Sequence, residues 1–183
     1  MIRIIFAAVL LCLSAGLATA DEVAIRDPEN TLIMQLKTGR VVIEMRPDLA
    51  PHTVTRIKQL VRSGFYDGLV FHRVVPGVVV QGGDPTGTGR GGSGFKLVAE
   101  FSDAKHVRGT VSMARSADRN SADSQFFICL QSHQKWDGQY TIWGQVIDGM
   151  ENVDMIKAGN DDSGKVTNPD SILWMKVAAD VKQ

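Results

Sequence analysis

Cysteine is scarce in this 183-residue chain: there are two, and Cys12 lies in an apolar segment at the N-terminus. If that segment is removed, Cys129 is the only cysteine left, so an intramolecular disulfide and a zinc–thiolate site are both excluded. Cys129 follows Ile128 in an apolar run, and the sequence offers no activating base beside it. We therefore interpret Cys129 as a small buried core residue rather than a catalytic thiol.

The chain also lacks an excess of charge of either sign. Its 20 basic and 20 acidic residues cancel, a balance that favours neither nucleic-acid binding nor a polybasic membrane surface. Low-complexity tracts, long charge blocks and internal repeats are missing too. The four histidines (His52, His72, His106 and His133) do not have the spacing of metal ligands. We expect no metal, no other cofactor and no nucleic-acid partner.

The first twenty residues differ in composition from the rest. Arg3 is the only charge among them, residues 4–17 are mostly apolar, and Ala18-Thr19-Ala20 gives an A-x-A site. This order is typical of a secretory signal peptide that is cleaved after Ala20, the last residue of the A-x-A site. The apolar stretch is short for a membrane span. We expect residues 1–20 to be a signal peptide and residues 21–183 to form one domain without stable membrane association after cleavage.

The remaining sequence alternates short apolar runs with glycine-rich connections. One helix is predicted to begin at Pro51 and to end before Gly64, and a second to cover residues 150–157. Many short strands with two helices favour a mainly β fold, a closed or nearly closed antiparallel barrel with the helices outside. The expected strands cover residues 31–36, 41–45, 70–74, 78–81, 110–114, 125–130, 140–146 and 172–177.

Two short motifs suggest other enzyme classes and do not fit them. Residues 87–92 satisfy the dinucleotide-binding pattern G-x-G-x-x-G, but no helical pattern follows, so we interpret them as a surface loop. Residues 132–135 fit S-x-x-K and residues 37–39 fit K-T-G, as in penicillin-interacting serine enzymes. Those motifs stand in the wrong order here, and the domain is too short for that class.

Two blocks place polar side chains in segments that otherwise look like buried strands: residues 71–84 and residues 124–129. A buried arginine or glutamine is costly unless it is paired, so Arg73, Gln81 and Gln125 indicate a functional surface. Together the blocks resemble the cyclophilin family of peptidyl-prolyl cis-trans isomerases, and the resemblance extends over nearly the whole mature chain. It implies an eight-stranded antiparallel barrel capped by two α-helices, with the active groove on its outside.

Two of these residues suit the chemistry that the resemblance implies. Rotation of a prolyl bond crosses a barrier of roughly 18–20 kcal/mol because amide resonance is lost in the twisted state. No bond is broken, so the reaction requires neither a nucleophile nor a metal. Arg73 offers a permanent charge and several rigid donors to the twisted amide. Gln81 carries both a donor and an acceptor, which can grip a substrate carbonyl and position Arg73.

The resemblance also implies which residues bind the substrate. Arg115 is expected in the groove, where its backbone could pair with the substrate chain. His72 alternates with Arg73 along the strand, so we expect its side chain to face away and to make a structural hydrogen bond. The proline pocket is expected to consist of Val78, Val79, Met113, Phe127, Trp136 and Tyr140, with Ala114 and Gln125 lining the groove.

Several positions depart from the best-known family members. Val78 stands where the family usually has Phe, which would make the pocket shallower. Lys135 stands where cyclosporin-sensitive members carry Trp, so we predict weak cyclosporin binding. Tyr140 replaces a His and Arg115 an Asn that are common in eukaryotic members. With the longer loop at residues 117–123, these two replacements indicate a bacterial form.

We therefore predict an exported, monomeric prolyl isomerase that acts on proline-containing unfolded or loop segments of other proteins. The periplasm is the expected compartment, with secretion beyond the cell as the alternative. A proline-binding chaperone or scaffold with little isomerase activity is a second hypothesis, and a barrel that binds a small apolar ligand is a third. Because no proton transfer limits the proposed reaction, activity should vary little between about pH 6 and 8.

Overall fold

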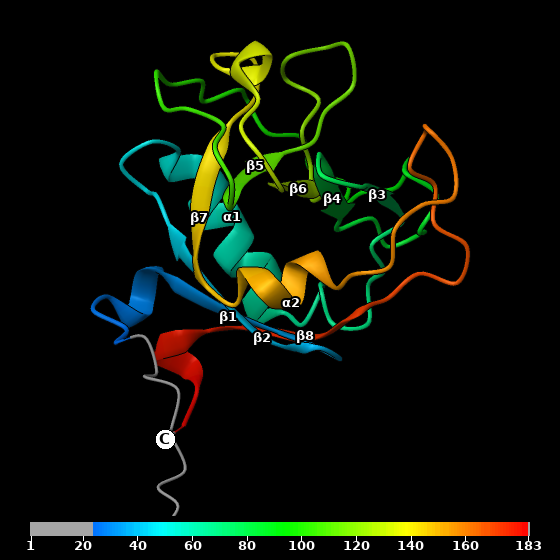
Figure 1. Cartoon of the computed structure of the whole chain (residues 1–183). Coiled ribbons are helices and arrows are strands. Elements are labelled where there is room, and N and C mark those ends of the chain that lie inside the picture. Colours follow the sequence, from blue (N-terminus) through cyan, green and yellow to red (C-terminus); the bar gives the residue numbers. More distant parts are fainter. Residues whose placement is uncertain (1–23, 183) are drawn as a thin grey trace, which may run out of the picture.

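The computed structural model describes residues 24–182, so the expected signal peptide lies outside the described residues. Within them one antiparallel sheet of eight strands curls around the core, as Figure 1 shows. The chain is mainly β, as predicted, and most strands begin and end close to the expected positions. The strands are β1 (Thr31–Leu36), β2 (Gly39–Met45), β3 (Arg73–Val75), β4 (Val79–Gly82), β5 (Thr110–Met113), β6 (Phe126–Cys129), β7 (Ile142–Asp148) and β8 (Ile172–Val177).

The expected closure of the barrel is not confirmed, because the sheet is an open half-barrel that turns through 223°. The strand order is β3-β4-β6-β5-β7-β2-β1-β8, so β3 and β8 lie at its two ends. Residues 70–72 were expected to belong to a strand, yet β3 begins at Arg73 and Val70 makes a single bridge to Ser171. A second single bridge joins Arg73 to Lys165. The segment before β8 thus runs past β3 as a loop rather than as a continuous paired strand.

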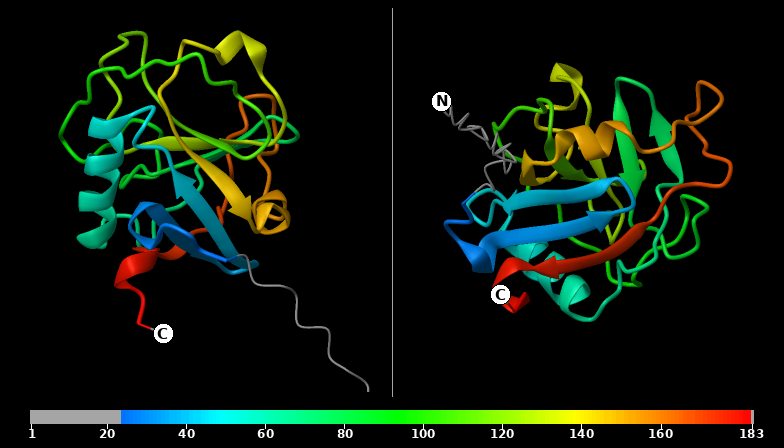
Figure 2. Two further views of the ribbon diagram at one scale, coloured as in Figure 1. Left: turned by 90° about the vertical axis from the view of Figure 1, so that its left-hand side faces the viewer. Right: turned by 60° about the horizontal axis from the view of Figure 1, so that its bottom comes forward.

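The two α-helices of the described residues, α1 (Pro51–Arg62) and α2 (Met150–Asp154), lie on opposite sides of the curled sheet, as both views in Figure 2 show. The carboxylate of Glu100 caps α1 by accepting hydrogen bonds from the backbone N–H groups of His52 and Thr53, at 2.9 and 2.8 Å. α2 ends three residues earlier than expected. In the described part of the chain, three short 3-10 helices complete the fold: η1 (Pro28–Asn30), η2 (Gln134–Trp136) and η3 (Ala178–Asp180). Within residues 24–182 no helix is long and apolar enough to cross a membrane.

Strand alternation divides the apolar side chains between the interior and the outer surface. In β6, Phe126 and Ile128 belong to the main core, whereas Phe127 and Cys129 belong to a separate cluster with Val79. The main core is packed with large side chains, including a fully buried Trp143. This packing disfavours the hypothesis of a small apolar ligand inside the barrel. Because alternate side chains of β6 point to opposite faces, the second cluster lies on the outside of the sheet.

Candidate active site

Four residues form a row across four neighbouring strands on the outer face of the sheet. Arg73 on β3 is paired with Gln81 on β4. Gln81 is paired with Phe127 on β6, and Phe127 with Ser112 on β5. Residues that are opposite one another in a sheet point to the same face. The two sequence blocks, about forty residues apart, therefore contribute to one continuous surface.

Hydrogen bonds hold the polar side chains of this surface in a line. Arg73 Nη1 donates to Gln81 Oε1 at 3.3 Å, and Gln81 Nε2 donates to Gln125 Oε1 at 3.0 Å. Gln125 Nε2 donates in turn to the carbonyl oxygen of Gly91 at 2.9 Å. On the other side, Arg73 Nε donates to the carbonyl oxygen of Ser163 at 3.0 Å. These bonds orient the half-buried guanidinium and leave its Nη2 without a partner among the described residues.

An aromatic pocket lies beside the guanidinium. The ring of Phe127 makes edge-on contacts with Trp136 and Tyr140, with centroids 5.3 and 5.4 Å apart. Edge-on packing of this kind is favourable and fixes the orientation of the rings. The cavity between them has a volume of about 190 Å³, and the rings line it together with the cation. Its lining residues are Arg73, Val79, Gln81, Ala114, Arg115, Phe127, Trp136 and Tyr140.

Three of the predicted site residues lie outside this pocket. Met113 is 1% exposed and belongs to the main core. Alternation explains its place, because Ser112 and Ala114 point outward on either side of it. Val78 packs against the outer cluster without lining the cavity. Gln125 lines an adjoining cavity of about 330 Å³, which extends the groove past Gln81.

His106 supports the pocket from behind, a role that no sequence motif indicated. Its buried ring lies parallel to Phe127, with centroids 6.1 Å apart, and edge-on to Trp136 and Tyr140. Nδ1 lies 3.2 Å from Asp137 Oδ1. Burial lowers the pKa of His106, an effect that the Asp137 carboxylate opposes. The ring thus contacts all three aromatic residues of the pocket.

The other ring nitrogen of His106 contacts the sheet itself. Nε2 lies 3.2 Å from Ser112 Oγ, and that hydroxyl donates to the carbonyl oxygen of Thr141 at 2.8 Å. His106 therefore ties the pocket to β5 and to the segment before β7. Its partners are scattered along the chain, so no local pattern could have revealed this role.

Two further side chains differ from their expected roles. Both ring nitrogens of His72 are buried and have no hydrogen-bond partner among the described residues, so the expected structural hydrogen bond is not found. Burial lowers the pKa of His72. Arg115 does more than offer its backbone: its guanidinium carbon lies 4.8 Å from the centre of the Tyr140 ring. Its Nε also donates to the carbonyl oxygen of Gln139 at 3.0 Å, which holds it over the pocket.

The geometry does not suit covalent catalysis by the one thiol in this region. Cys129 is fully buried, and burial raises the pKa of its thiol to about 12. The thiolate, which is the nucleophile, is therefore scarcely populated near neutral pH. Among residues 24–182 no group of three or more His, Cys, Asp or Glu side chains is arranged to hold a metal. What the site offers is an apolar pocket that faces an oriented cation.

Comparison with known proteins identifies the family. The family model described as "Cyclophilin type peptidyl-prolyl cis-trans isomerase/CLD" matches residues 31–177. A probable peptidyl-prolyl cis-trans isomerase of Brucella suis is 47% identical over 189 residues, covering 96% of this chain and 95% of the relative. A peptidyl-prolyl cis-trans isomerase of Synechococcus elongatus is 40% identical over 148 residues, and the match covers 81% of this chain and 96% of the relative.

Solved structures agree with this assignment. Cyclophilin AquaCyp293 from Hirschia baltica superposes with a TM-score of 0.76 at 26% identity. The match covers 85% of this chain and 76% of the Hirschia baltica chain. A cyclophilin-type isomerase of Cryptosporidium parvum, crystallised in the presence of the dipeptide Ala-Pro, gives a TM-score of 0.73 at 31% identity. That match covers 80% of this chain and 98% of the other. The chain belongs to the cyclophilin family and is a peptidyl-prolyl cis-trans isomerase.

Proposed function

We propose that the enzyme rotates X-Pro bonds by holding the proline ring among Phe127, Trp136 and Tyr140 while Arg73 donates a hydrogen bond to the twisted amide. The observation that carries this proposal is the placement of Arg73, whose oriented guanidinium lines the aromatic cavity. A proline ring suits the aromatic wall of this cavity, whose volume is about 190 Å³. The Cryptosporidium parvum relative, crystallised in the presence of Ala-Pro, supports proline-containing peptides as the ligand.

The energy that Arg73 can supply has a useful size. A hydrogen bond to a charged group contributes about 1.5–3 kcal/mol, and each ~1.4 kcal/mol taken from a barrier accelerates a reaction tenfold. Arg73 alone would therefore account for roughly a ten- to hundredfold acceleration. Because Gln81 and Ser163 already hold the guanidinium, little reorganisation is needed during the reaction. Gln81 and the pocket would supply the remainder by fixing the substrate.

The test compares the wild type with Arg73→Ala on a peptide that contains one X-Pro bond, with the cis–trans exchange rate measured by NMR. We expect the substitution to reduce the catalysed rate at least tenfold without lowering the unfolding temperature. Arg46→Ala is the matched control, because Arg46 is exposed and pairs with Asp48 outside the groove. Equal catalysis by the wild type and Arg73→Ala would reject the role of Arg73.

We propose further that the enzyme is exported and works as a monomer in the periplasm, on unfolded or loop segments of other exported proteins. The order of charge, apolar run and A-x-A site in residues 1–20 supports export. Cell fractionation followed by N-terminal sequencing tests this assignment. We expect the enzyme in the periplasmic fraction with Asp21 as its first residue, whereas an intact chain in the cytoplasm would contradict it.

The second hypothesis, a proline-binding chaperone or scaffold with little turnover, rests on Val78. The structure gives it little support, because Val78 packs against the outer cluster without lining the cavity. The same NMR experiment separates the two functions, because a scaffold would bind the peptide without accelerating its exchange. Acceleration of the cis–trans exchange by the wild type would support the isomerase and reject the scaffold.

A further inference from the structure

A second cavity lies beside Arg73, next to the proline pocket. Its volume is about 520 Å³, against about 190 Å³ for the proline pocket. Arg73 and Gln81 line both cavities, so the two are neighbours with these side chains between them. An extended substrate that leaves the proline pocket over the guanidinium would reach this space next. The lining residues are His72, Arg73, Gln81, Gly87, Thr88, Gly89, Ser163, Lys165 and Val166.

The charges that line this second cavity are positive. Arg73 and Lys165 are both among its lining residues, and these residues include no carboxylate. The ammonium of Lys165 has no ion pair or hydrogen bond within residues 24–182. A single β-bridge joins the backbone of Lys165 to that of Arg73. Two cations that line one cavity, with no carboxylate in the lining, attract a carboxylate.

None of the nearby acids lines the cavity, although Asp84 and Asp161 keep their negative charge. Asp84 accepts hydrogen bonds from the backbone N–H groups of Thr86, Thr88 and Gly89. Burial opposes ionisation of Asp84, but these bonds outweigh it and lower its pKa to about 2. Asp161 accepts two hydrogen bonds from Ser163. Both carboxylates are thus engaged in holding the loops that form the cavity walls.

The walls include an anchored loop and a buried histidine. Gly164 accepts a hydrogen bond from the backbone of Val74 at 2.7 Å, which anchors the loop that carries Lys165. His72 is 8% exposed, and neither of its ring nitrogens has a partner among the described residues. A neutral imidazole carries one N–H donor, and a buried donor without a partner is costly.

We propose that this cavity binds an acidic side chain, aspartate or glutamate, of the substrate polypeptide on the side that passes over Arg73. The proposal rests on the proposed function, because it uses the same guanidinium and the same groove. It makes the enzyme selective for X-Pro bonds that are flanked by an acidic residue. Successive residues of an extended chain advance by about 3.3 Å, so the acid lies within a few residues of the proline.

The test uses peptides with one X-Pro bond and alanine elsewhere, in which each flanking position in turn carries Glu, Gln or Lys. The protein is purified from a host that expresses the full chain, and binding is measured by calorimetry at low salt. At one position we expect Glu to bind about three- to fivefold more tightly than Gln, the size expected of a partly exposed ion pair. Lys at that position should bind more weakly than Gln, and 0.5 M salt should reduce the preference.

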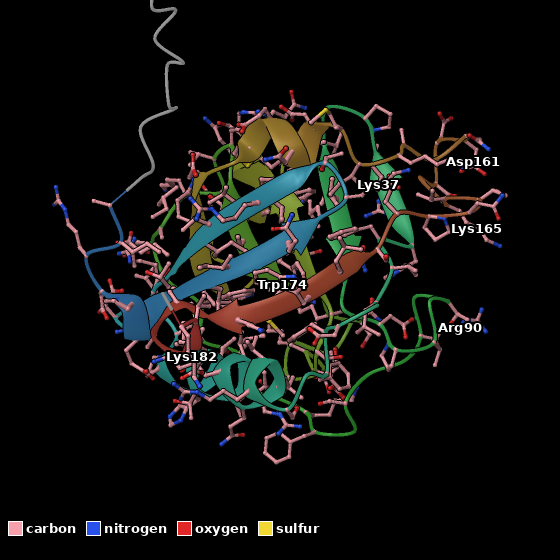
Figure 3. All side chains as sticks on the ribbon, turned by 90° about the horizontal axis from the view of Figure 1, so that it is seen from below. Lys37, Arg90, Asp161, Lys165, Trp174 and Lys182 are labelled. Carbon is pink, nitrogen blue, oxygen red and sulfur yellow. The ribbon has the colours of Figure 1, made fainter. Side chains whose placement is uncertain are left out.

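Two matched variants assign the preference to the cavity. Lys165→Gln should abolish it without lowering the unfolding temperature. Lys176→Gln should leave it intact, because Lys176 lies over Trp174. In Figure 3 Trp174 occupies the middle of the outer sheet face, whereas Lys165 projects from the edge of the molecule. A lack of Glu preference at every position, or a preference that survives Lys165→Gln, would overturn the proposal.

Exchange rates measured on the same peptides separate this proposal from the proposed function. If the wild type accelerates exchange and Arg73→Ala does not, but no acidic position is preferred, the second site fails and the mechanism stands. If Lys165-dependent selectivity is found without acceleration of exchange, the acidic site stands and the mechanism fails.

Discussion

Gln81 lies directly opposite Arg73 in the β3–β4 pair and accepts a hydrogen bond from its guanidinium. The same amide donates to Gln125, which in turn donates to the backbone at Gly91. The orientation of the arginine therefore depends on two amides that the chain supplies from two distant segments. A change at either amide should reach the reaction through Arg73.

Gln81→Leu should reduce kcat/KM about three- to tenfold, because it removes one oriented partner of the guanidinium and one donor to the substrate. The measurement is NMR exchange on an X-Pro peptide. In an Arg73→Ala background the same substitution should have a smaller effect, since the two side chains act together. Full additivity of the two losses would contradict the coupling between Gln81 and Arg73.

His106→Leu should loosen the proline pocket. It removes the contacts to Asp137 and Ser112, and we expect a loss of about 2–4 kcal/mol in the free energy of unfolding. Peptide binding should weaken more than turnover at saturation, because the rings of the pocket lose their support. Denaturant titration and substrate titration measure the two effects. The control His52→Ala, at an exposed position, should change stability by less than about 0.5 kcal/mol.

Activity should vary little between pH 6 and 8, whereas stability should fall in acid. Burial lowers the pKa of both His72 and His106 from the ordinary 6.5. Below that value the unfolded chain binds more protons than the folded protein, so the free energy of unfolding decreases as pH falls from about 6.5. Above about pH 7.5 neither histidine makes the free energy of unfolding depend on pH. A bell-shaped activity profile between pH 6 and 8 would indicate a titrating catalytic group instead.

Two glycines with similar backbone angles should respond differently to alanine. Gly83 has φ +83°, and an added Cβ would lie 2.4 Å from the carbonyl oxygen of Ser124. Gly77 has φ +67°, with nothing within 4 Å of an added Cβ. Gly77→Ala should lower the free energy of unfolding only by the backbone strain, about 1–2 kcal/mol. Gly83→Ala should lower it clearly more, because the steric overlap is added to that strain. Thermal unfolding of both variants tests this order, and equal losses would refute the steric argument.

Cyclosporin should bind weakly. By the resemblance of the sequence to the family, Lys135 on η2 is expected to stand where sensitive members carry an indole, so calorimetry should give a dissociation constant weaker than nanomolar. Lys135→Trp should tighten binding severalfold, since it restores one hydrogen-bond donor worth about 1 kcal/mol. A nanomolar affinity of the wild type would show that the adjacent Trp136 can replace the missing donor.

The sequence by itself determined the local elements and the chemistry. Apolar periodicity placed α1 and the β1–β2 hairpin, since spacing along a helix or strand is a local property. Arg73 and Gln81 stood out because polar side chains in strand-like segments are costly without a purpose. The family also followed from the two blocks that contain them. These features needed no knowledge of which segments meet in space.

Only the tertiary structure decided how the strands meet and which faces they share. It turned Met113 into the core, left the half-barrel open between β3 and β8, and brought His106 beneath the aromatic pocket. It also put Lys165 beside Arg73, more than ninety residues away along the chain. Each of these outcomes depends on register and contacts between distant segments. Local spacing does not encode them, because the free energy that selects them arises from packing in the folded chain.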